Sequence, residues 1–374
     1  MTTETDTRHM ARALQLARLG LYTTDPNPRV GCVMVRDGQV VGEGFHVRAG
    51  EPHAEILALR QAGEAARGAT VYVTLEPCAH FGRTPPCADA LIHAGVARVV
   101  AAMVDPNPRV AGQGLARLAN AGIEIASGVL QAEARALNPG FISRMERGRP
   151  YVRVKLAMSL DGRTAMASGE SRWITGEAAR RDVQRLRARA GAILTGSGTV
   201  LADNPGLDVR LSAQELGIEG PVRQPLRVVL DTRLVCTPEA KLFSTGGPVL
   251  VLTAEQDPAR HEALRARGAE VEAVASAPRG LDLHAVLELL ARREINELHV
   301  EAGPILCGSL MQAGLVDELV IYMAPHLMGN DARGLLNLGL EHMDERVPLR
   351  IEDIRAVGGD WRITARVNGY GVRK

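Results

Sequence analysis

A set of metal-ligand residue types constrains this chain more than any other feature of its sequence. His53 lies in the segment Pro52-His53-Ala54-Glu55, and Cys78 and Cys87 lie in a second segment further along the chain. One imidazole and two thiolates are the protein ligands of a zinc ion whose fourth tetrahedral position stays open for water. The fold must therefore bring these two segments together around one metal ion.

Glu55 is expected to move protons and not to bind the metal. Zinc lowers the pKa of water from about 15.7 to about 7, and a nearby carboxylate can take that proton and pass it to a departing amine. The order His-x-Glu, Pro-Cys and a later cysteine is typical of zinc deaminases, in which the glutamate is not a ligand. A closed structural zinc site with His80 as the fourth ligand is the alternative.

Helices are expected to begin at the metal ligands. Apolar residues from Ile56 to Ala62 predict a helix that starts at His53, and the run from Ala88 to Ile92 predicts another after Cys87. The positive ends of both helices would favour thiolates. Side chains at i and i+2 do not share a face of a regular helix, so His53 must lie at the first turn to converge with Glu55.

Length and composition indicate two domains and a reducing compartment. A chain of 374 residues exceeds most single cores, and a charged segment at 144–150 separates two α/β patterns, which predicts domains over residues 1–147 and 148–374. A formal net charge of +1 offers no attraction to nucleic acid. Five cysteines, an odd number, favour reduced thiols and a cytoplasmic location. We expect neither a signal peptide nor a membrane span.

Strands alternate with helices in both halves, which predicts α/β folds with sites at the carboxyl ends of strands. The first half is expected to contain a helix over 6–19, a hairpin that turns at Asp37-Gly38, and strands over 70–75 and 98–104. In the second half we expect a helix over 177–190 and strands over 151–157, 192–194, 226–230, 248–252, 298–300 and 319–322.

Three further features allow either a structural or a binding role. Asn27, held between two prolines, either contacts a ligand or caps a turn. The helix over 177–190 carries five arginines that either face solvent or include a subset aimed at a phosphate. Glycine turns at Gly196 and Gly303 follow strands, and each could present backbone N–H groups to a pyrophosphate or simply allow a tight turn.

Nearly the whole chain resembles the bifunctional riboflavin-biosynthesis deaminase/reductase family. In the first half the likeness rests on the segments 27–31, 46–55 and 77–87, where the eight residues between the two cysteines resemble this family's own loop. In the second half it rests on the segments 155–163, 171–175, 201–205 and 301–304. Ala302 stands where members of the family often have glycine.

The resemblance implies a cytidine-deaminase-like three-layer αβα domain followed by a dihydrofolate-reductase-like α/β domain, with zinc and NADPH as cofactors. It implies deamination of 2,5-diamino-6-ribosylamino-4(3H)-pyrimidinone 5′-phosphate, and then reduction of 5-amino-6-(5-phosphoribosylamino)uracil to 5-amino-6-(5-phosphoribitylamino)uracil. The expected partners are small pyrimidine ribotides, not nucleic acid or a membrane. We also expect a homodimer or a larger homo-oligomer.

The resemblance also assigns residues to the two sites. In the first domain it implies zinc on His53, Cys78 and Cys87, proton transfer by Glu55, and substrate contacts by Asn27 and His80, with His46 as a further candidate. For NADPH it implies Ala157, Trp173, Thr199, Asp203, Gly303, Pro304, Ile305, Leu306, Cys307, Gly308 and Ser309. For the second substrate it implies Ser171, Arg187, Leu207, Arg210 and Glu301.

Two charged groups of the second site carry specific expectations. The guanidinium groups of Arg187 and Arg210 suit the 5′-phosphate of the substrate, because their donor geometry matches phosphate oxygens. Lys155 either assists proton transfer at the opened sugar or forms a plain salt bridge.

Two rival functions follow from the same sequence. A deaminase that edits nucleic acid would need a basic stripe and exposed aromatic residues for base stacking, and the second half has few aromatic residues beyond Trp173 and Trp361. Alternatively, the second domain is a non-catalytic dimerisation module. An absence of NADPH oxidation with deaminated substrate would favour that second rival.

Overall fold

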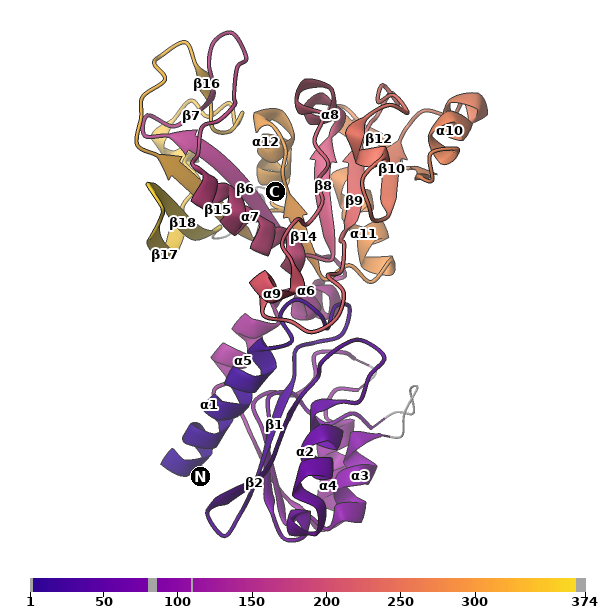
Figure 1. Cartoon of the computed structure of the whole chain (residues 1–374), viewed down its shortest axis with the longest axis vertical. Helices are drawn as coiled ribbons and strands as arrows, with labels where there is room; N and C mark the ends of the chain where they lie inside the picture. Colours follow the sequence, from indigo (N-terminus) through magenta and orange to yellow (C-terminus); the bar gives the residue numbers. More distant parts are fainter. Residues whose placement is uncertain (1–2, 80–85, 109, 368–374) are drawn as a thin grey trace. The chain divides into compact units, whose positions relative to one another are not determined.

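Two units follow one another along the chain, Met1–Arg149 and Pro150–Lys374, and each has its own sheet (Figure 1). The computed structural model describes residues 3–79, 86–108 and 110–367. Within these ranges, no helix has both the length and the apolar character needed to cross a bilayer.

The first unit is built on a five-stranded sheet with the strand order β2-β1-β3-β4-β5. Its strands are β1 (Gly31–Arg36), β2 (Gln39–Phe45), β3 (Thr70–Val73), β4 (Arg98–Ala101) and β5 (Glu124–Ser127). β1 pairs antiparallel with β2 and β3, whereas β3, β4 and β5 run parallel. The predicted turn joins β1 to β2, because Asp37 and Gly38 both have positive φ, as a two-residue hairpin loop requires.

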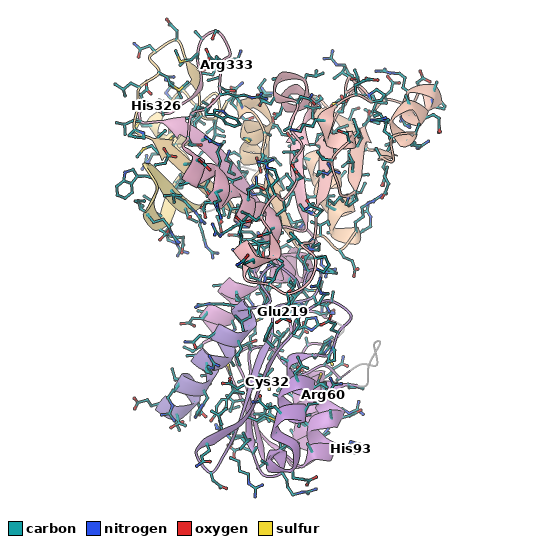
Figure 2. The ribbon with its side chains drawn as sticks, viewed as in Figure 1. Cys32, Arg60, His93, Glu219, His326 and Arg333 are labelled. Carbon is teal, nitrogen blue, oxygen red and sulfur yellow. The ribbon has the colours of Figure 1, made fainter. Side chains whose placement is uncertain are left out.

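Helices cover both faces of this sheet. One face carries α1 (Glu4–Arg18), α5 (Gln131–Leu137) and α6 (Pro139–Arg147), and the other carries α2 (Ala54–Ala62), α3 (Cys87–Ala94) and α4 (Gln113–Asn120). Successive strand residues point to opposite faces, so Val33 packs under α1 while Cys32 packs under α2. Figure 2 shows Cys32 inside this unit, and Arg60 and His93 on the outer surfaces of α2 and α3. The predicted three-layer αβα arrangement is confirmed.

Helix α1 begins two residues earlier than its apolar pattern predicts. Thr3 and Asp6 form a capping box, in which each side chain accepts a hydrogen bond from the backbone N–H of the other residue. Asp6 is also bonded to Tyr72 and Arg98. A polar residue therefore lies on the buried face of the helix, which an apolar stripe does not reveal.

The second unit is built on a nine-stranded sheet with the order β11-β10-β9-β8-β14-β6-β15-β18-β17. Its strands are β6 (Tyr151–Ser159), β8 (Ala192–Gly196), β9 (Leu226–Leu230), β10 (Val249–Thr253), β11 (Glu270–Ala273), β14 (Glu297–Val300), β15 (Glu318–Ala324), β17 (Leu349–Val357) and β18 (Asp360–Val367). Neighbours from β11 to β15 are parallel, and β15, β18 and β17 are antiparallel. Two small ribbons pair β7 (Arg163–Ala165) with β16 (Arg333–Gly334) and β12 (Ser276–Ala277) with β13 (Gly280–Leu281).

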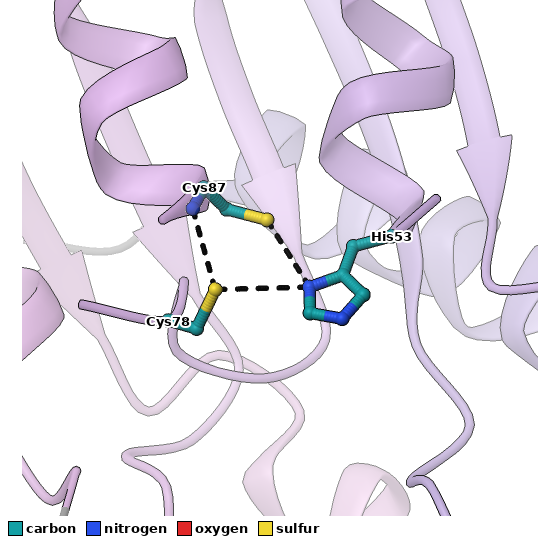
Figure 3. A group of neighbouring side chains, drawn as sticks. All are labelled: His53, Cys78 and Cys87. Atoms are coloured by element: carbon teal, nitrogen blue, oxygen red, sulfur yellow. Dashed lines mark hydrogen bonds between the residues drawn. The ribbon is translucent and has the colours of Figure 1, made fainter. Parts of the chain in front are cut away.

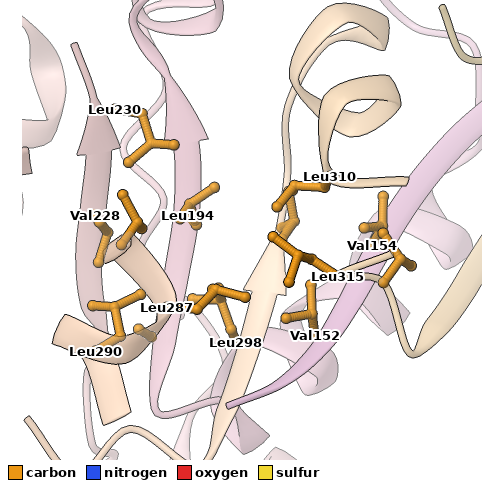
Figure 4. Packing of buried hydrophobic residues seen from close by; sticks show 14 of the residues in the cluster. Val152, Val154, Leu194, Val228, Leu230, Leu287, Leu290, Leu298, Leu310 and Leu315 are labelled. Carbon is orange, nitrogen blue, oxygen red and sulfur yellow. The ribbon is translucent and has the colours of Figure 1, made fainter. Parts of the chain in front are cut away.

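Helices also cover both faces of the second sheet. α11 (Leu283–Arg292) and α12 (Pro304–Gln312) pack on one face, where Leu287, Leu290 and Leu310 meet Val152 and Leu298 (Figure 4). Full burial of one such side chain contributes about 1.5–3 kcal/mol. α7 (Glu177–Arg189) and α10 (Pro258–Arg265) pack on the opposite face, and the short helices α8 (Ser197–Asp203) and α9 (Ala213–Leu216) follow β8. The predicted α/β class of this unit is confirmed.

The hairpin of β17 and β18 was not predicted. Most residues of β17 are exposed, so the strand lacks the apolar run by which buried strands are recognised. Gly358 and Gly359 lie between the two strands. A Gly-Gly pair between two alternating segments is a hairpin signal that could have identified this element.

Candidate metal centre and cofactor cleft

Three donor atoms converge in the first unit (Figure 3). His53 Nδ1 lies 3.2 Å from Cys87 Sγ and 3.7 Å from Cys78 Sγ. Zinc bonds of about 2.1 Å to nitrogen and about 2.3 Å to sulfur, at a tetrahedral angle, place such atoms about 3.6 Å apart. The donor set and its spacing therefore fit one zinc ion. In the part of the chain that the structure describes, these three residues form the whole donor group.

Two helix N-termini position these ligands. His53 is the N-cap of α2, with an extended backbone (φ −72°, ψ 164°), and its imidazole makes no capping hydrogen bond. Cys87 is the first residue of α3, and its backbone N–H donates to Cys78 Sγ over 3.3 Å. His53 thus lies at the helix start, where it was expected.

Close contact between α2 and β2 sets the depth of the centre. A Cβ atom on Gly42 would lie 2.3 Å from the Ala58 carbonyl oxygen, and one on Gly44 would lie 2.5 Å from the Ala54 carbonyl oxygen. Both distances are too short for a real side chain, because packed atoms cannot overlap. The two glycines therefore allow α2 to lie directly on the strand and to carry its first turn to the metal centre.

Glu55 lies beside the three donors but is not one of them. Glu55 is 3% exposed as a residue, and burial raises the pKa of its carboxyl group to about 6. It does not belong to the group of atoms that could hold the metal. A buried carboxyl group next to a metal centre, and outside its ligand set, is suited to moving protons.

The two cysteines differ in their pKa values. Interaction with the side chain of Cys87, followed by that with His53, lowers the pKa of Cys78 to about 4 although burial opposes it. The interaction between the two cysteines, together with burial, raises the pKa of Cys87. The first thiolate of the pair therefore forms on Cys78.

Glu76 organises the segment that carries Cys78. Its buried carboxylate accepts backbone hydrogen bonds of 2.8–3.2 Å from Asp105, Gly112, Gly114 and Leu115. These bonds hold the loop between β4 and α4 against the strand end that leads to the metal ligand. This role of Glu76 was not predicted from the sequence. A carboxylate at the end of a buried strand was the available signal, because it requires several donors.

Asn27 and His46 form a second polar group at the centre. His46 Nδ1 lies 3.2 Å from the carbonyl oxygen of Pro52, which can only accept, so that nitrogen carries the proton. His46 Nε2 must then accept from the Asn27 amide nitrogen, 3.0 Å away. The ring of His46 also meets the ring of His53 edge-on, with centroids 5.4 Å apart. The side-chain nitrogen of Asn27 is therefore engaged by His46, and its side-chain carbonyl oxygen takes no part in this hydrogen bond. His80 lies outside the described residues.

A cleft of about 1130 Å³ opens at the carboxyl ends of β6, β8, β9 and β14 in the second unit. Its volume exceeds the usual range for drug-sized ligands, about 300–1000 Å³, so it has room for a dinucleotide together with a second ligand. Large apolar side chains are exposed beside it, with Trp173 70% and Ile305 72% exposed. Bare apolar surface of this kind is typical of a ligand site.

The cleft brings together most residues expected to bind NADPH or the second substrate. They are Ala157, Ser171, Trp173, Arg187, Thr199, Asp203, Leu207, Arg210, Glu301, Gly303, Pro304, Ile305, Leu306 and Ser309. Two expected residues do not line it. The buried thiol of Cys307 donates to the carbonyl of Ala302 over 3.3 Å. A Cβ atom on Gly308 would meet the carbonyl oxygen of Asn337 at 2.2 Å, so this residue faces backbone.

Arg187 and Glu301 form an ion pair at the base of the cleft. Arg187 Nε and Nη2 donate to the two carboxylate oxygens over 2.5 Å and 2.9 Å, and Nη1 donates to the carbonyl of Asp208. Although burial opposes ionisation, Arg187 holds the pKa of Glu301 well below its usual range. The arginines of α7 are thus divided between two environments, because Arg187 is buried while Arg181 pairs with Glu215 at the surface.

Lys155 lines the same part of the cleft. Burial lowers the pKa of Lys155, and the nearby Glu301 carboxylate partly offsets that effect. Within the described ranges, Lys155 makes no ion pair with a carboxylate, unlike Arg187. The simple salt bridge considered for this residue is therefore not formed.

Comparisons with known proteins agree for both units. The sequence model of the RibD C-terminal domain matches residues 150–363, and that of the cytidine and deoxycytidylate deaminase zinc-binding region matches residues 3–103. Riboflavin biosynthesis protein RibD of Escherichia coli (strain K12) is 54% identical over 362 residues, which cover 95% of this chain and 97% of that protein.

Solved structures show the same relation over the full length. Acinetobacter baumannii RibD (form 1) has a TM-score of 0.90 and 45% identity, covering 98% of this chain and 99% of that one. A diaminohydroxyphosphoribosylaminopyrimidine deaminase/5-amino-6-(5-phosphoribosylamino)uracil reductase from Thermotoga maritima has a TM-score of 0.82 and 33% identity, covering 97% and 99%. The chain therefore belongs to the RibD family of bifunctional riboflavin biosynthesis enzymes, in which a zinc-binding deaminase domain is followed by an NADPH-dependent reductase domain.

Proposed function

We propose that the first unit deaminates 2,5-diamino-6-ribosylamino-4(3H)-pyrimidinone 5′-phosphate and that the second unit reduces the product, 5-amino-6-(5-phosphoribosylamino)uracil. In the first step water supplies the oxygen that replaces the ring amino group, which leaves as ammonia. In the second step the ribosyl group becomes ribityl. The observation that carries the first step is the convergence of His53, Cys78 and Cys87 beside the buried Glu55.

In the first unit each residue has a separate task. His53, Cys78 and Cys87 would hold a zinc ion, which would supply a Lewis acid that lowers the pKa of a water molecule. Glu55 takes a proton from the attacking water and delivers it to the departing amino group. Asn27, oriented by its bond to His46, presents its carbonyl oxygen to N–H groups of the pyrimidine. His80 stays a predicted residue of the same pocket.

In the second unit the cleft divides between cofactor and substrate. NADPH, when bound, supplies the hydride for the sugar carbon C1′. Ala157, Trp173, Thr199, Asp203 and the turn that begins at Gly303 hold the cofactor. Cys307 and Gly308 stay in this proposal only as part of α12, since neither lines the cleft.

Substrate contacts in the second unit come from five residues around the ion pair. Ser171 and Leu207 line the same cleft, and Glu301 reaches the substrate while Arg187 keeps its carboxylate charged and oriented. The side chain of Arg210 is 60% exposed, and among the described residues its one ion pair is with Asp208, so it can reach the 5′-phosphate, with Arg187 as a second donor. Lys155 assists proton transfer at the opened sugar.

One incubation tests both steps. Purified protein is given the diaminopyrimidinone ribotide with and without NADPH, and the products are identified by mass spectrometry. We expect the deaminated ribosyl compound without NADPH and the ribityl compound with it. Recovery of the starting ribotide would refute the deaminase assignment. Deaminated product that stays unreduced with NADPH present would favour a non-catalytic second unit.

We also propose that the deaminase domain spans residues 1–147 and the reductase domain residues 148–374, in a cytoplasmic homodimer or larger homo-oligomer. All five cysteines are free thiols, which supports a reducing compartment. Light scattering coupled to size-exclusion chromatography tests the oligomer, because a mass equal to one chain would refute it.

A further inference from the structure

The cleft of the second unit continues past the residues that the sequence assigned to it. Thr232, Arg279 and Gly280 also line it, at the carboxyl end of β9 and at the turn between β12 and β13. A Cβ atom on Gly280 would lie 3.4 Å from Thr232 Oγ1, so this turn lies directly against the Thr232 hydroxyl. The residue next to Arg279 in the chain thus lies against the Thr232 hydroxyl, and both Thr232 and Arg279 line this end of the cleft.

The order of strands places this end away from the reacting groups. β6, β14, β8 and β9 are consecutive neighbours in the sheet. Lys155 lies on β6 and Glu301 follows β14, whereas Thr232 follows β9. Three strand spacings of about 4.8 Å separate β6 from β9. If the turn before α12 held the pyrophosphate of a dinucleotide and β6 its nicotinamide, the adenosine half would extend towards β9.

Arg279 carries a charge that no acid neutralises among the described residues. Its Nη1 donates to Gln312 Oε1 over 3.2 Å, and this amide oxygen is uncharged. Among the other arginines that line the cleft, Arg187 pairs with Glu301 and Arg210 with Asp208, whereas Arg180 and Arg333 make no ion pair with a described acid. What distinguishes Arg279 is its place near the end of β9, where it adds a positive charge to the cleft lining.

The acid closest in sequence to Thr232 is already engaged. Asp231 is fully buried, and its two carboxylate oxygens accept the backbone N–H groups of Val235 and Cys236 over 2.9 Å and 2.8 Å. In Rossmann folds a carboxylate binds the ribose 2′-hydroxyl of NAD and an arginine accommodates the 2′-phosphate of NADP, and the same charge preference applies to any site that binds the 2′-phosphate. The region at the end of β9 thus contains hydrogen-bond donors for a phosphate, whereas the Asp231 carboxylate is already bonded to the backbone.

We propose that Arg279, which lines the cleft near the end of β9, binds the 2′-phosphate of NADPH and makes the reductase prefer NADPH to NADH. The proposal rests on the assignment of the cleft to this cofactor. The 2′-phosphate is the sole difference between the two dinucleotides, and a guanidinium bonds phosphate oxygens through short charge-assisted hydrogen bonds.

Binding of the oxidised dinucleotides tests this without turnover. Full-length, zinc-loaded protein and its Arg279→Gln variant are titrated with NADP⁺ and NAD⁺ by isothermal titration calorimetry. Loss of charged hydrogen bonds should raise the Kd for NADP⁺ by about 10- to 100-fold and leave the Kd for NAD⁺ unchanged. Arg279→Lys keeps the charge and should retain most of the preference.

Two further variants serve as controls. Arg292→Gln removes an exposed charge of α11 outside the cleft and should change neither affinity. Lys241→Gln removes another cation that lines the cleft, and loss of the NADP⁺ preference there, but not in Arg279→Gln, would overturn the proposal. Equal weakening of both dinucleotides in Arg279→Gln would also overturn it. Failure of the wild-type protein to bind either dinucleotide would instead remove the cofactor assignment, and this inference with it.

Discussion

The metal centre and the cofactor cleft are assembled in opposite ways. The metal centre draws three donors from residues 53–87, and their ligand atoms lie within 4.8 Å of one another. The cleft draws on segments from β6 to β16 and has a volume of about 1130 Å³. A small centre of this kind depends on every ligand, whereas a large cleft spreads its binding over many contacts. Substitutions should therefore act almost all-or-none in the first unit and by degrees in the second.

The source of positive charge also differs between the two sites. The metal centre presents thiols, an imidazole and a carboxyl group, and the cation it needs comes from outside the chain. The cleft carries its own cations and neutralises some of them internally, as Arg187 and Glu301 show. Metal removal should thus abolish deamination and spare reduction.

The largest effect is expected from Cys78→Ala. Without one of three ligands the protein should lose zinc, and ammonia release should fall by at least about 10³-fold because water is no longer activated. NADPH oxidation with deaminated substrate should not change. Metal analysis and the two assays check this, with Cys236→Ala of the second unit as a variant that keeps zinc. Retention of zinc by Cys78→Ala would show that Cys78 is not a ligand.

Glu55→Gln should separate metal binding from proton transfer. The amide cannot carry the proton, so ammonia release should fall by about 10²- to 10⁴-fold while zinc stays bound. Glu51→Gln alters an exposed carboxylate nearby and should leave the rate unchanged. If the Glu55→Gln variant came out of purification without zinc, Glu55 would have to be counted among the ligands.

Arg187→Ala should have a graded effect on the second unit. It leaves the Glu301 carboxylate buried without its partner, which destabilises the unit by about 3 kcal/mol and raises the KM for the substrate. Both tryptophans, Trp173 and Trp361, belong to this unit, so tryptophan fluorescence during denaturation reports its unfolding. In the double variant with Glu301→Gln, the decrease in unfolding free energy should be smaller than the sum of the decreases in the two single variants.

The matched control lies on the same helix. Arg181→Ala removes a surface ion pair with Glu215, and such pairs contribute little in solvent. We expect no change in the unfolding curve or in KM. Equal effects of the two arginine variants would contradict the division of α7 into a buried and a solvent-facing set.

Asp6→Asn should have the smallest effect on stability, and this effect should depend on pH. Hydrogen bonding to Arg98, which outweighs the cost of burial, holds the pKa of Asp6 well below its usual range. The ionised group therefore stabilises the first unit above about pH 4, and this contribution is lost as the pH falls through the folded-state pKa. The free energy of unfolding of the wild type should exceed that of Asp6→Asn by about 1 kcal/mol at pH 7. The difference should be smaller at pH 3. Denaturant-induced zinc release at pH 7, and hydrogen exchange in α1 at both pH values, measure the difference.

The two sites were predictable from sequence to different degrees. His53, Cys78 and Cys87 could be located because few residue types bind zinc and their order is distinctive. Residues of the cleft were found through resemblance, and Thr232 and Arg279 were missed because neither belongs to a recognised motif. The exposed hairpin of β17 and β18 was missed because its strands lack a continuous apolar run.

By itself, the sequence determined which metal the first unit can hold and that both units are α/β, because ligand chemistry and side-chain periodicity are local properties. Only the tertiary structure decided that His46 orients Asn27, that Glu76 accepts hydrogen bonds from four backbone N–H groups, and that Arg187 pairs with Glu301. These contacts join common residue types that are far apart along the chain. Their pairing depends on the packing that brings them together.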